Sequence, residues 1–98
     1  MAITVVSRWK GKQEDALPIA REAAPILKNH GATAFRLGYC HSGPYAGQIF
    51  TALIYPDGET YGRAMQALSE HAQYQRLLAE ASKVAELQER SVIVTQDL

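Results

Sequence analysis

The sequence predicts a single α+β domain with the element order β-α-β-β-α-β. Segments rich in β-branched and aromatic residues alternate with stretches of helical spacing, and glycine or proline clusters separate them. With 98 residues the chain has room for one domain and not two, so we expect this domain to span residues 1–98. Hydrophobic residues make up 47% of the chain and charged residues 20%, which indicates a globular protein rather than a disordered one.

The first strand and the first helix are predicted from the N-terminal third of the chain. Residues Ile3 to Trp9 are mostly β-branched or aromatic and are typical of a strand. From Gln13 to His30 the apolar residues recur at steps of three and four, which places them on one face of a helix. Gly31 is then expected to end this helix in a left-handed conformation.

Two prolines fall inside the predicted first helix. Pro18 is tolerated in the first turn if the helix begins near Asp15, because the first amides have no partner within the helix. Pro25 removes an interior hydrogen bond, and we expect it to kink the helix so that it curves over a sheet.

The segment from Thr33 to Ala81 predicts two further strands and a second helical region. Thr33 to His41 predicts a second strand, and Gln48 to Tyr55 a third that is almost continuously apolar. Asp57 is expected to cap a helix over Glu59 to Leu68. Around Ser69 the phase of the apolar spacing changes, so a separate helical piece should carry Tyr74, Leu77, Leu78 and Ala81.

The last strand is predicted over Leu87 to Gln96. Right-handed crossovers place both helical layers on the same face of the sheet, which leaves the other face bare. The third strand nevertheless carries apolar side chains on both sides: Phe50, Ala52 and Ile54 on one, and Ile49, Leu53 and Tyr55 on the other. An exposed apolar face of this size is unusual in a monomer, so we expect a homodimer formed through the bare sheet face.

The element order, the two-sided third strand and the broken second helix resemble the dimeric α+β barrel superfamily of ferredoxin-like domains. The segment Ser69 to Leu78 is similar to a helical stretch of that superfamily, in which an acidic residue and a histidine precede an aromatic residue. The resemblance, to branches like the antibiotic-biosynthesis monooxygenases and the NIPSNAP proteins, implies a four-stranded antiparallel sheet with helices on one face. It also implies that the sheets of two subunits close into a barrel. The superfamily includes cofactor-independent monooxygenases, haem-degrading enzymes, isomerases, dehydratases and non-catalytic effector-binding modules.

Composition and charge argue against several classes of protein. Ten basic and ten acidic side chains give a net charge of zero, so the basic surface typical of nucleic-acid binding is not expected. The short apolar run before Arg8 is not a signal peptide, and no window approaches the length of a membrane helix. The single cysteine, Cys40, cannot form an internal disulfide and suits a cytoplasmic location.

The motifs of metal, phosphate and hydrolase sites are also missing from the sequence. Cys40 and His41 are adjacent, but neighbours on a strand point to opposite faces and cannot readily share a metal ion. No Walker-type loop and no glycine elbow around a serine are present. We therefore expect no metal site and no cofactor, with haem as a further option.

The candidate site residues are aromatic side chains, histidines and arginines that could face a cleft between helices and sheet. His71 is the candidate catalytic acid or base, and the alternative is a solvent-facing or dimer-contact histidine. The candidate ligand-binding residues are Trp9, Tyr39, His41, Tyr55, Tyr74 and Arg90. Arg36 and Arg90 lie in apolar strands, where a charge needs a partner or an anionic ligand, although a surface position also explains them.

One residue pattern of the superfamily does not carry over to this chain. Its monooxygenases and haem degraders typically use an asparagine on the first strand and a tryptophan on a later helix, but here the only asparagine is Asn29 and the only tryptophan is Trp9. Two functions remain open. One is a small cofactor-independent enzyme, of monooxygenase or isomerase type, acting on an apolar or aromatic molecule. The other is a non-catalytic dimeric module that binds a small molecule or a protein partner.

Overall fold

The computed structural model describes all residues 1–98 and has the predicted order, with the second helical region divided in two. The elements are β1 (Ala2–Gly11), α1 (Gln13–Asn29), β2 (Ala34–Tyr39), β3 (Ile49–Tyr55), α2 (Gly58–Ser69), α3 (Ala72–Val84) and β4 (Ala85–Thr95). The four strands form one sheet in the order β2-β3-β1-β4, and all neighbouring strands are antiparallel. The predicted ferredoxin-like α+β fold is therefore confirmed.

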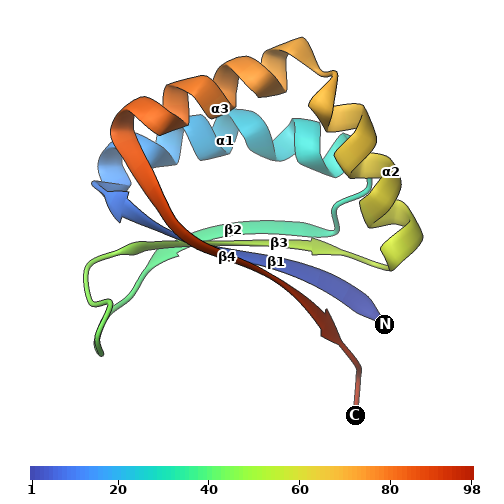
Figure 1. Cartoon of the computed structure of the whole chain (residues 1–98), viewed down its shortest axis with the longest axis horizontal. Coiled ribbons are helices and arrows are strands. Elements are labelled where there is room, and N and C mark those ends of the chain that lie inside the picture. Colours follow the sequence, from blue (N-terminus) through green and yellow to red (C-terminus); the bar gives the residue numbers. More distant parts are fainter.

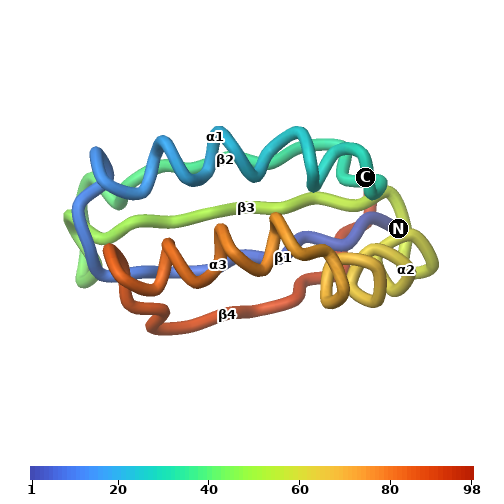
Figure 2. The backbone as a smooth tube through the Cα atoms, turned by 90° about the horizontal axis from the view of Figure 1, so that it is seen from above, coloured from blue at the N-terminus to red at the C-terminus, as the bar shows by residue number.

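The helices form a single layer on one face of the sheet, and the opposite face is uncovered (Figure 1). Seen from above, α1 runs along β2 and α3 along β1, while β4 lies outside both helices (Figure 2). This is the arrangement expected from two right-handed crossovers. It leaves the helix-side residues of β4 uncovered, and Val92 and Val94 are 50% and 56% exposed.

The hydrophobic core lies between the helix layer and the two central strands. The antiparallel register places Val5 opposite Leu53 on one side and Val92 on the other, so these side chains share the helix face. The buried residues that make up this core are Ile3, Val5, Ala23, Ile26, Leu27, Ala32, Leu53, Tyr55, Ala64, Leu68 and Leu77. Since alternate residues of β1 and β3 point to the other face, Val6 and Ile54 lie on the side without helices.

Both prolines lie in the interior of α1. The helix begins at Gln13 rather than near Asp15, so Pro18 is not in the first turn as expected. Pro18 and Pro25 are exposed, and the carbonyls that lose their i+4 donors can therefore bind water. The helix runs to Asn29 without interruption, and the Gly31 that follows has the predicted positive φ, of 100°.

The second helical region has a cap at the start of each helix. The Asp57 carboxylate accepts a hydrogen bond of 2.7 Å from the Thr60 amide, which confirms the predicted cap and holds the pKa of Asp57 below its ordinary value. Helix α2 ends at Ser69 and α3 begins at Ala72, which agrees with the phase change predicted around Ser69. At the start of α3, Nδ1 of His71 accepts a hydrogen bond of 3.1 Å from the Tyr74 amide.

The last strand begins at Ala85, two residues earlier than predicted. Ala85 pairs with Gly11, which extends the β1–β4 ladder to the end of α3. At Gly11 a Cβ atom would lie 2.6 Å from the carbonyl oxygen of Val84. Only glycine therefore allows the chain to pass directly from α3 into β4 at this point.

Candidate functional site

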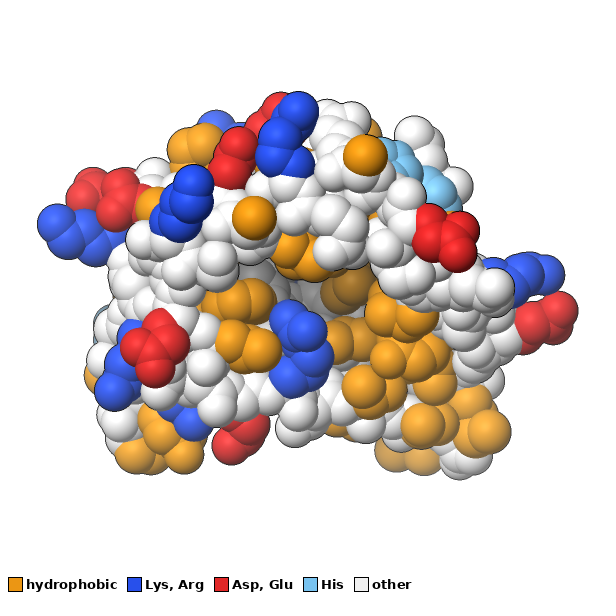
Figure 3. Space-filling view, turned by 45° about the horizontal axis from the view of Figure 1, so that its top comes forward, with side chains coloured by type: hydrophobic (Ala, Val, Ile, Leu, Met, Phe, Trp, Pro, Cys, Tyr) orange, Lys and Arg blue, Asp and Glu red, His pale blue; other side chains and the backbone are white.

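A cavity of about 370 Å³ lies between the helix layer and the sheet. Its volume falls within the range of small-molecule sites, roughly 300 to 1,000 Å³. Twenty of its 25 lining residues are hydrophobic. Figure 3 shows a hollow between the helices and the sheet that is lined mainly by hydrophobic side chains. The cavity is thus the part of the molecule most suited to hold a small apolar molecule.

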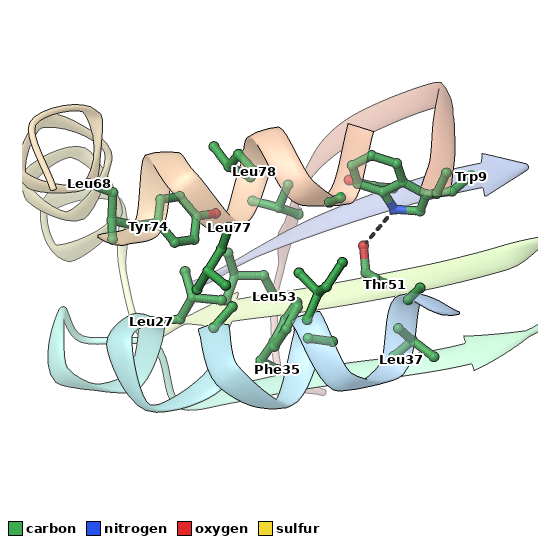
Figure 4. A pocket seen from close by; sticks show the side chains of 18 of the residues that line it. Trp9, Leu27, Phe35, Leu37, Thr51, Leu53, Leu68, Tyr74, Leu77 and Leu78 are labelled. Carbon is green, nitrogen blue, oxygen red and sulfur yellow. Dashed lines mark hydrogen bonds between the residues drawn. The ribbon is translucent and has the colours of Figure 1, made fainter. Parts of the chain in front are cut away.

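The period-two alternation of three strands builds the floor of the cavity. Residues two apart on a strand point to the same face, and here that face is covered by the helices. The floor residues are Val5, Ser7 and Trp9 of β1, Phe35 and Leu37 of β2, and Ile49, Thr51 and Leu53 of β3. Leu27 of α1 and Leu68, Tyr74, Leu77 and Leu78 of the α2–α3 region close the cavity from the helix side (Figure 4).

The Trp9 side chain is fixed by a hydrogen bond across the floor. Its indole Nε1–H donates to Oγ1 of Thr51 at 3.1 Å, as Figure 4 shows. This bond satisfies the indole donor and the threonine hydroxyl together. The face of the ring therefore remains as an apolar surface toward the cavity.

Arg90 is the only charged residue that lines the cavity. It lies opposite Ser7 in the β1–β4 ladder, and its Nε donates a hydrogen bond of 2.9 Å to Oγ of Ser7. The guanidinium carbon also lies 5.7 Å from the centre of the Trp9 ring, within the range of a cation–π contact. Ser7 is only 2% exposed, so a buried hydroxyl holds the arginine in position.

Tyr74 brings a polar group to the helix side of the cavity. Burial raises the pKa of its hydroxyl above the ordinary value, and the positive charge of Arg90 partly opposes this rise. The phenol therefore stays protonated at neutral pH and can donate a hydrogen bond. No side chain or carbonyl of the protein accepts one from it. Because His71 caps the first turn of α3, it also sets the position of Tyr74.

The structure brings three of the predicted site residues together at the cavity: Trp9, Tyr74 and Arg90. Tyr39 is 57% exposed at the end of β2, and His41 is exposed beyond it. Both lie in the segment Thr33 to His41 that was predicted as the second strand, but the strand ends at Tyr39, before the Ser42–Gly43–Pro44 turn. Neither Tyr39 nor His41 lines the cavity.

Tyr55 lies behind the cavity wall, in the core. It is fully buried, and its ring makes an edge-to-face contact with Tyr61 at 5.6 Å between centroids. Its hydroxyl has no hydrogen-bond partner. Burial, with smaller effects from Tyr74 and Tyr61, raises the pKa of Tyr55 to about 12. Its place in the core gives it a packing role, and ligand contact by Tyr55 stays a prediction.

His71 does not line the cavity. Its Nδ1 is used in capping α3, and its ring meets the ring of His30 edge-on at 5.5 Å. His30 in turn bonds through Nδ1 to the carbonyl oxygen of Ile26, at the end of α1. The two histidines therefore join the ends of two helices, and the catalytic role predicted for His71 remains a prediction.

Ser7 and Thr51 were not among the predicted site residues, yet they supply the two hydroxyl groups bonded to Arg90 and Trp9. A signal for Ser7 was present in the sequence. It continues the series Ile3 and Val5 at period two, so it is a polar residue on an apolar face. Thr51 has the same signal between Ile49 and Leu53.

Other chemistry in the molecule is limited. Histidine, cysteine, aspartate and glutamate side chains form no group of three or more that could hold a metal ion. Sγ of Cys40 donates to the carbonyl oxygen of Ser42 at 2.9 Å and takes no part in the cavity. None of the helices has the length and apolar character needed to span a membrane.

Several solved structures share this fold. SnoaB, a cofactor-independent oxygenase from Streptomyces nogalater, is 11% identical, with a TM-score of 0.74 over 99% of this chain and 95% of its own. A dimeric ferredoxin-like protein from an uncultured marine organism is 12% identical, with a TM-score of 0.69 over 98% of both chains. A NIPSNAP family protein from Agrobacterium tumefaciens is 18% identical, with a TM-score of 0.70 over 98% of this chain and 87% of its own.

These similarities confirm the predicted resemblance at the level of the fold, because such low identities carry no more than the fold. No curated protein shows a significant sequence match to this chain. The model of one family matches residues 1–95, nearly the whole chain. The protein therefore belongs to the family described as Domain of unknown function (DUF6854).

Proposed function

We propose that this protein binds an apolar or aromatic small molecule between its helices and its sheet and acts on it as a small cofactor-independent enzyme, of monooxygenase or isomerase type. The observation that carries the proposal is the cavity of about 370 Å³ with 20 hydrophobic residues among its 25 lining residues. An apolar cavity of this kind removes water from a bound molecule and holds it in a fixed orientation.

The likeness to SnoaB, a cofactor-independent oxygenase, supports the enzyme reading through the shared fold. Reactions without a cofactor leave the protein with three tasks: binding, exclusion of water and stabilisation of charge on the substrate. The apolar floor serves the first two. The Arg90 guanidinium and the Tyr74 hydroxyl are the groups that could stabilise a developing negative charge.

A non-catalytic binding module is the second candidate, and one observation favours it. The lining residues include no histidine, aspartate, glutamate, lysine or cysteine, so the cavity has none of the usual general bases. If the substrate must lose a proton, the acceptor has to be a water molecule, a residue outside the cavity or one of the lining tyrosines, Tyr61 and Tyr74, after loss of its own proton.

We also propose that the working unit is a homodimer formed through the uncovered face of the sheet. Apolar side chains of three strands lie on that face, among them Val6, Ile54 and Ile93. Leaving such a surface in water is unfavourable, and a second copy would cover it. A dimeric relative of the same fold supports this assembly. The lone cysteine fits a place in the reducing cytoplasm.

Binding in the cavity is tested with the neutral fluorescent probe N-phenyl-1-naphthylamine. We expect saturable binding to the unmodified protein, and its loss in Ala81→Phe, because Ala81 lines the cavity on α3 and a phenyl ring there occupies the space of the probe. Ala79→Phe is the matched control, because Ala79 lies on α3 but is exposed outside the cavity. Equal probe binding by Ala81→Phe and the unmodified protein would refute a ligand site in this cavity.

Turnover separates the enzyme from the binding module. An electron-rich aromatic such as 1,4-dihydroxynaphthalene reacts slowly with O₂ in buffer, and an oxygenase of this kind should accelerate the uptake of O₂. The rate should fall to the buffer rate in Ala81→Phe and stay unchanged in Ala79→Phe. Saturable binding without any acceleration, for this and related hydroxylated aromatics, would favour the non-catalytic module.

A further inference from the structure

The corner of the cavity formed by Arg90, Ser7 and Trp9 holds a positive charge without a negative partner. The ion pairs of the protein join Arg8 to Glu89 and Arg63 to Glu59, so no carboxylate pairs with Arg90. Its one hydrogen bond within the protein uses Nε. The N–H groups on Nη1 and Nη2 have no acceptor in the protein and remain free for a ligand.

The exposed guanidinium is positioned by one hydrogen bond and one ring contact from β1. Ser7 is buried at 2% exposure, and its hydroxyl accepts from Nε at 2.9 Å. The Trp9 ring lies 5.7 Å from the guanidinium carbon, and its own Nε1–H is tied to Thr51. A guanidinium fixed at Nε presents its two terminal nitrogens as a planar fork, which matches the two oxygens of a carboxylate.

Tyr74 lines the same cavity from the helix layer, at the end opposite Trp9 (Figure 4). Its phenol stays protonated at neutral pH because burial raises its pKa, and no group of the protein accepts a hydrogen bond from it. An otherwise apolar cavity therefore has two sets of donors that the protein leaves free, one on a strand and one on a helix.

We propose that the ligand of this cavity is an organic anion, with an apolar or aromatic body on the cavity floor and an acidic oxygen group bound by the Nη1 and Nη2 groups of Arg90. The inference rests on the proposed function and names the class of its substrate. Ser7 is a positioning residue in this site, since its hydroxyl accepts from Nε of Arg90. Arg90 is exposed at the mouth of the cavity, so an anionic group bound there stays in contact with water while the apolar body enters the cavity.

The test uses two probes that differ by a single anionic group. N-phenyl-1-naphthylamine is neutral, and 1-anilinonaphthalene-8-sulfonate has the same rings with one sulfonate. In Arg90→Gln we expect the Kd of the anionic probe to rise about tenfold or more, and the Kd of the neutral probe to stay within about twofold. Arg21→Gln is the control, because Arg21 is an exposed arginine of α1 outside both the cavity and the sheet, and both affinities should be unchanged.

Ser7 is tested through the ratio of the two affinities. Ser7→Ala should lower the preference for the anionic probe by a few-fold, because the guanidinium loses its anchor, and Ser7→Thr should restore it because the hydroxyl returns. If the unmodified protein binds the neutral probe and Arg90→Gln leaves the Kd of the anionic probe unchanged, the anion site is overturned and the cavity remains as a ligand site. Equal loss of both probes would show that Arg90 only supports the fold. Failure of both probes to bind the unmodified protein would overturn the proposed function and the anion site together.

Discussion

The two faces of the sheet are made by the same strands and have opposite surroundings. Leu53 and Ile54 are neighbours on β3, and Leu53 is 8% exposed beneath the helices while Ile54 lies on the face that no helix covers (Figure 1). Both are large aliphatic residues, so hydrophobicity alone does not distinguish them. The helices of the chain cover only one side of its apolar sheet, and the other side is the surface that we propose for the homodimer.

The faces also differ in their polar residues. On the helix face, Ser7 and Thr51 each bond to another side chain around the cavity. On the uncovered face, Arg8 bonds to Oε1 of Gln48 at 2.7 Å and lies 3.8 Å from the centre of the Tyr45 ring. The loop between β2 and β3 therefore covers one end of the uncovered face. The remaining apolar part is the surface we assign to the dimer.

The largest expected effect is the loss of the proposed dimer when a charge is placed on the uncovered face. Ile54→Lys would bury two unpaired ammonium groups in a dimer, at a cost of several kcal/mol. We expect sedimentation velocity at micromolar concentration to give a dimer for the unmodified protein and a monomer for Ile54→Lys. Ala79→Lys, on the exposed side of α3, should remain a dimer. A stable, soluble monomer in the unmodified protein would contradict the assignment of this face.

On the helix side of the sheet, alkaline pH should lower the free energy of unfolding through the buried Tyr55. The pKa of Tyr55 is about 12 in the folded protein against an ordinary value of 10.0, so the unfolded state loses its proton first as the pH rises. The contribution of protonated Tyr55 to the free energy of unfolding is therefore fully present below pH 10. It is lost progressively between about pH 10 and 12, by roughly 2 to 3 kcal/mol. Urea unfolding across this pH range should show the loss.

Tyr55→Phe is the control for this prediction. It removes the titrating group and also an unpaired buried hydroxyl, so stability near neutral pH should change by no more than about 1 kcal/mol. The variant should lose less stability than the unmodified protein between pH 10 and 12. Identical alkaline curves for the two proteins would show that Tyr55 ionises as easily in the fold as in the unfolded chain.

The smallest expected effect concerns the helix layer above the cavity. His71→Ala removes the acceptor for the Tyr74 amide and should lower stability by about 1 kcal/mol, whereas His71→Asn keeps an acceptor and should lose less. Thermal unfolding measures both. If activity is found and His71 acts as an acid or base, His71→Asn will lose turnover while keeping most of its stability. Retained turnover in His71→Asn would leave the histidine as a helix cap.

Much of the fold could be predicted because local patterns determine it. The apolar spacing from Gln13 predicted α1, and the phase change at Ser69 predicted the break between α2 and α3. The element bounds were less accurate at β4, since its start depends on the close approach of Gly11 to Val84. That contact joins residues far apart in the sequence, and no local pattern reports it.

The candidate site shows the same division. The sequence by itself determined which strand residues share a face, because side chains alternate along a strand whatever the tertiary structure. Trp9 and Arg90 were candidates because of their residue types, an aromatic ring and a charge in an apolar strand, and no local pattern joined Ser7 to Arg90 across 83 positions of the chain. His71 was predicted as a candidate acid or base, and in the structure its Nδ1 accepts from the Tyr74 amide at the start of α3. Only the tertiary structure decided these pairings, because they depend on strand register and helix ends rather than on the local order of residues.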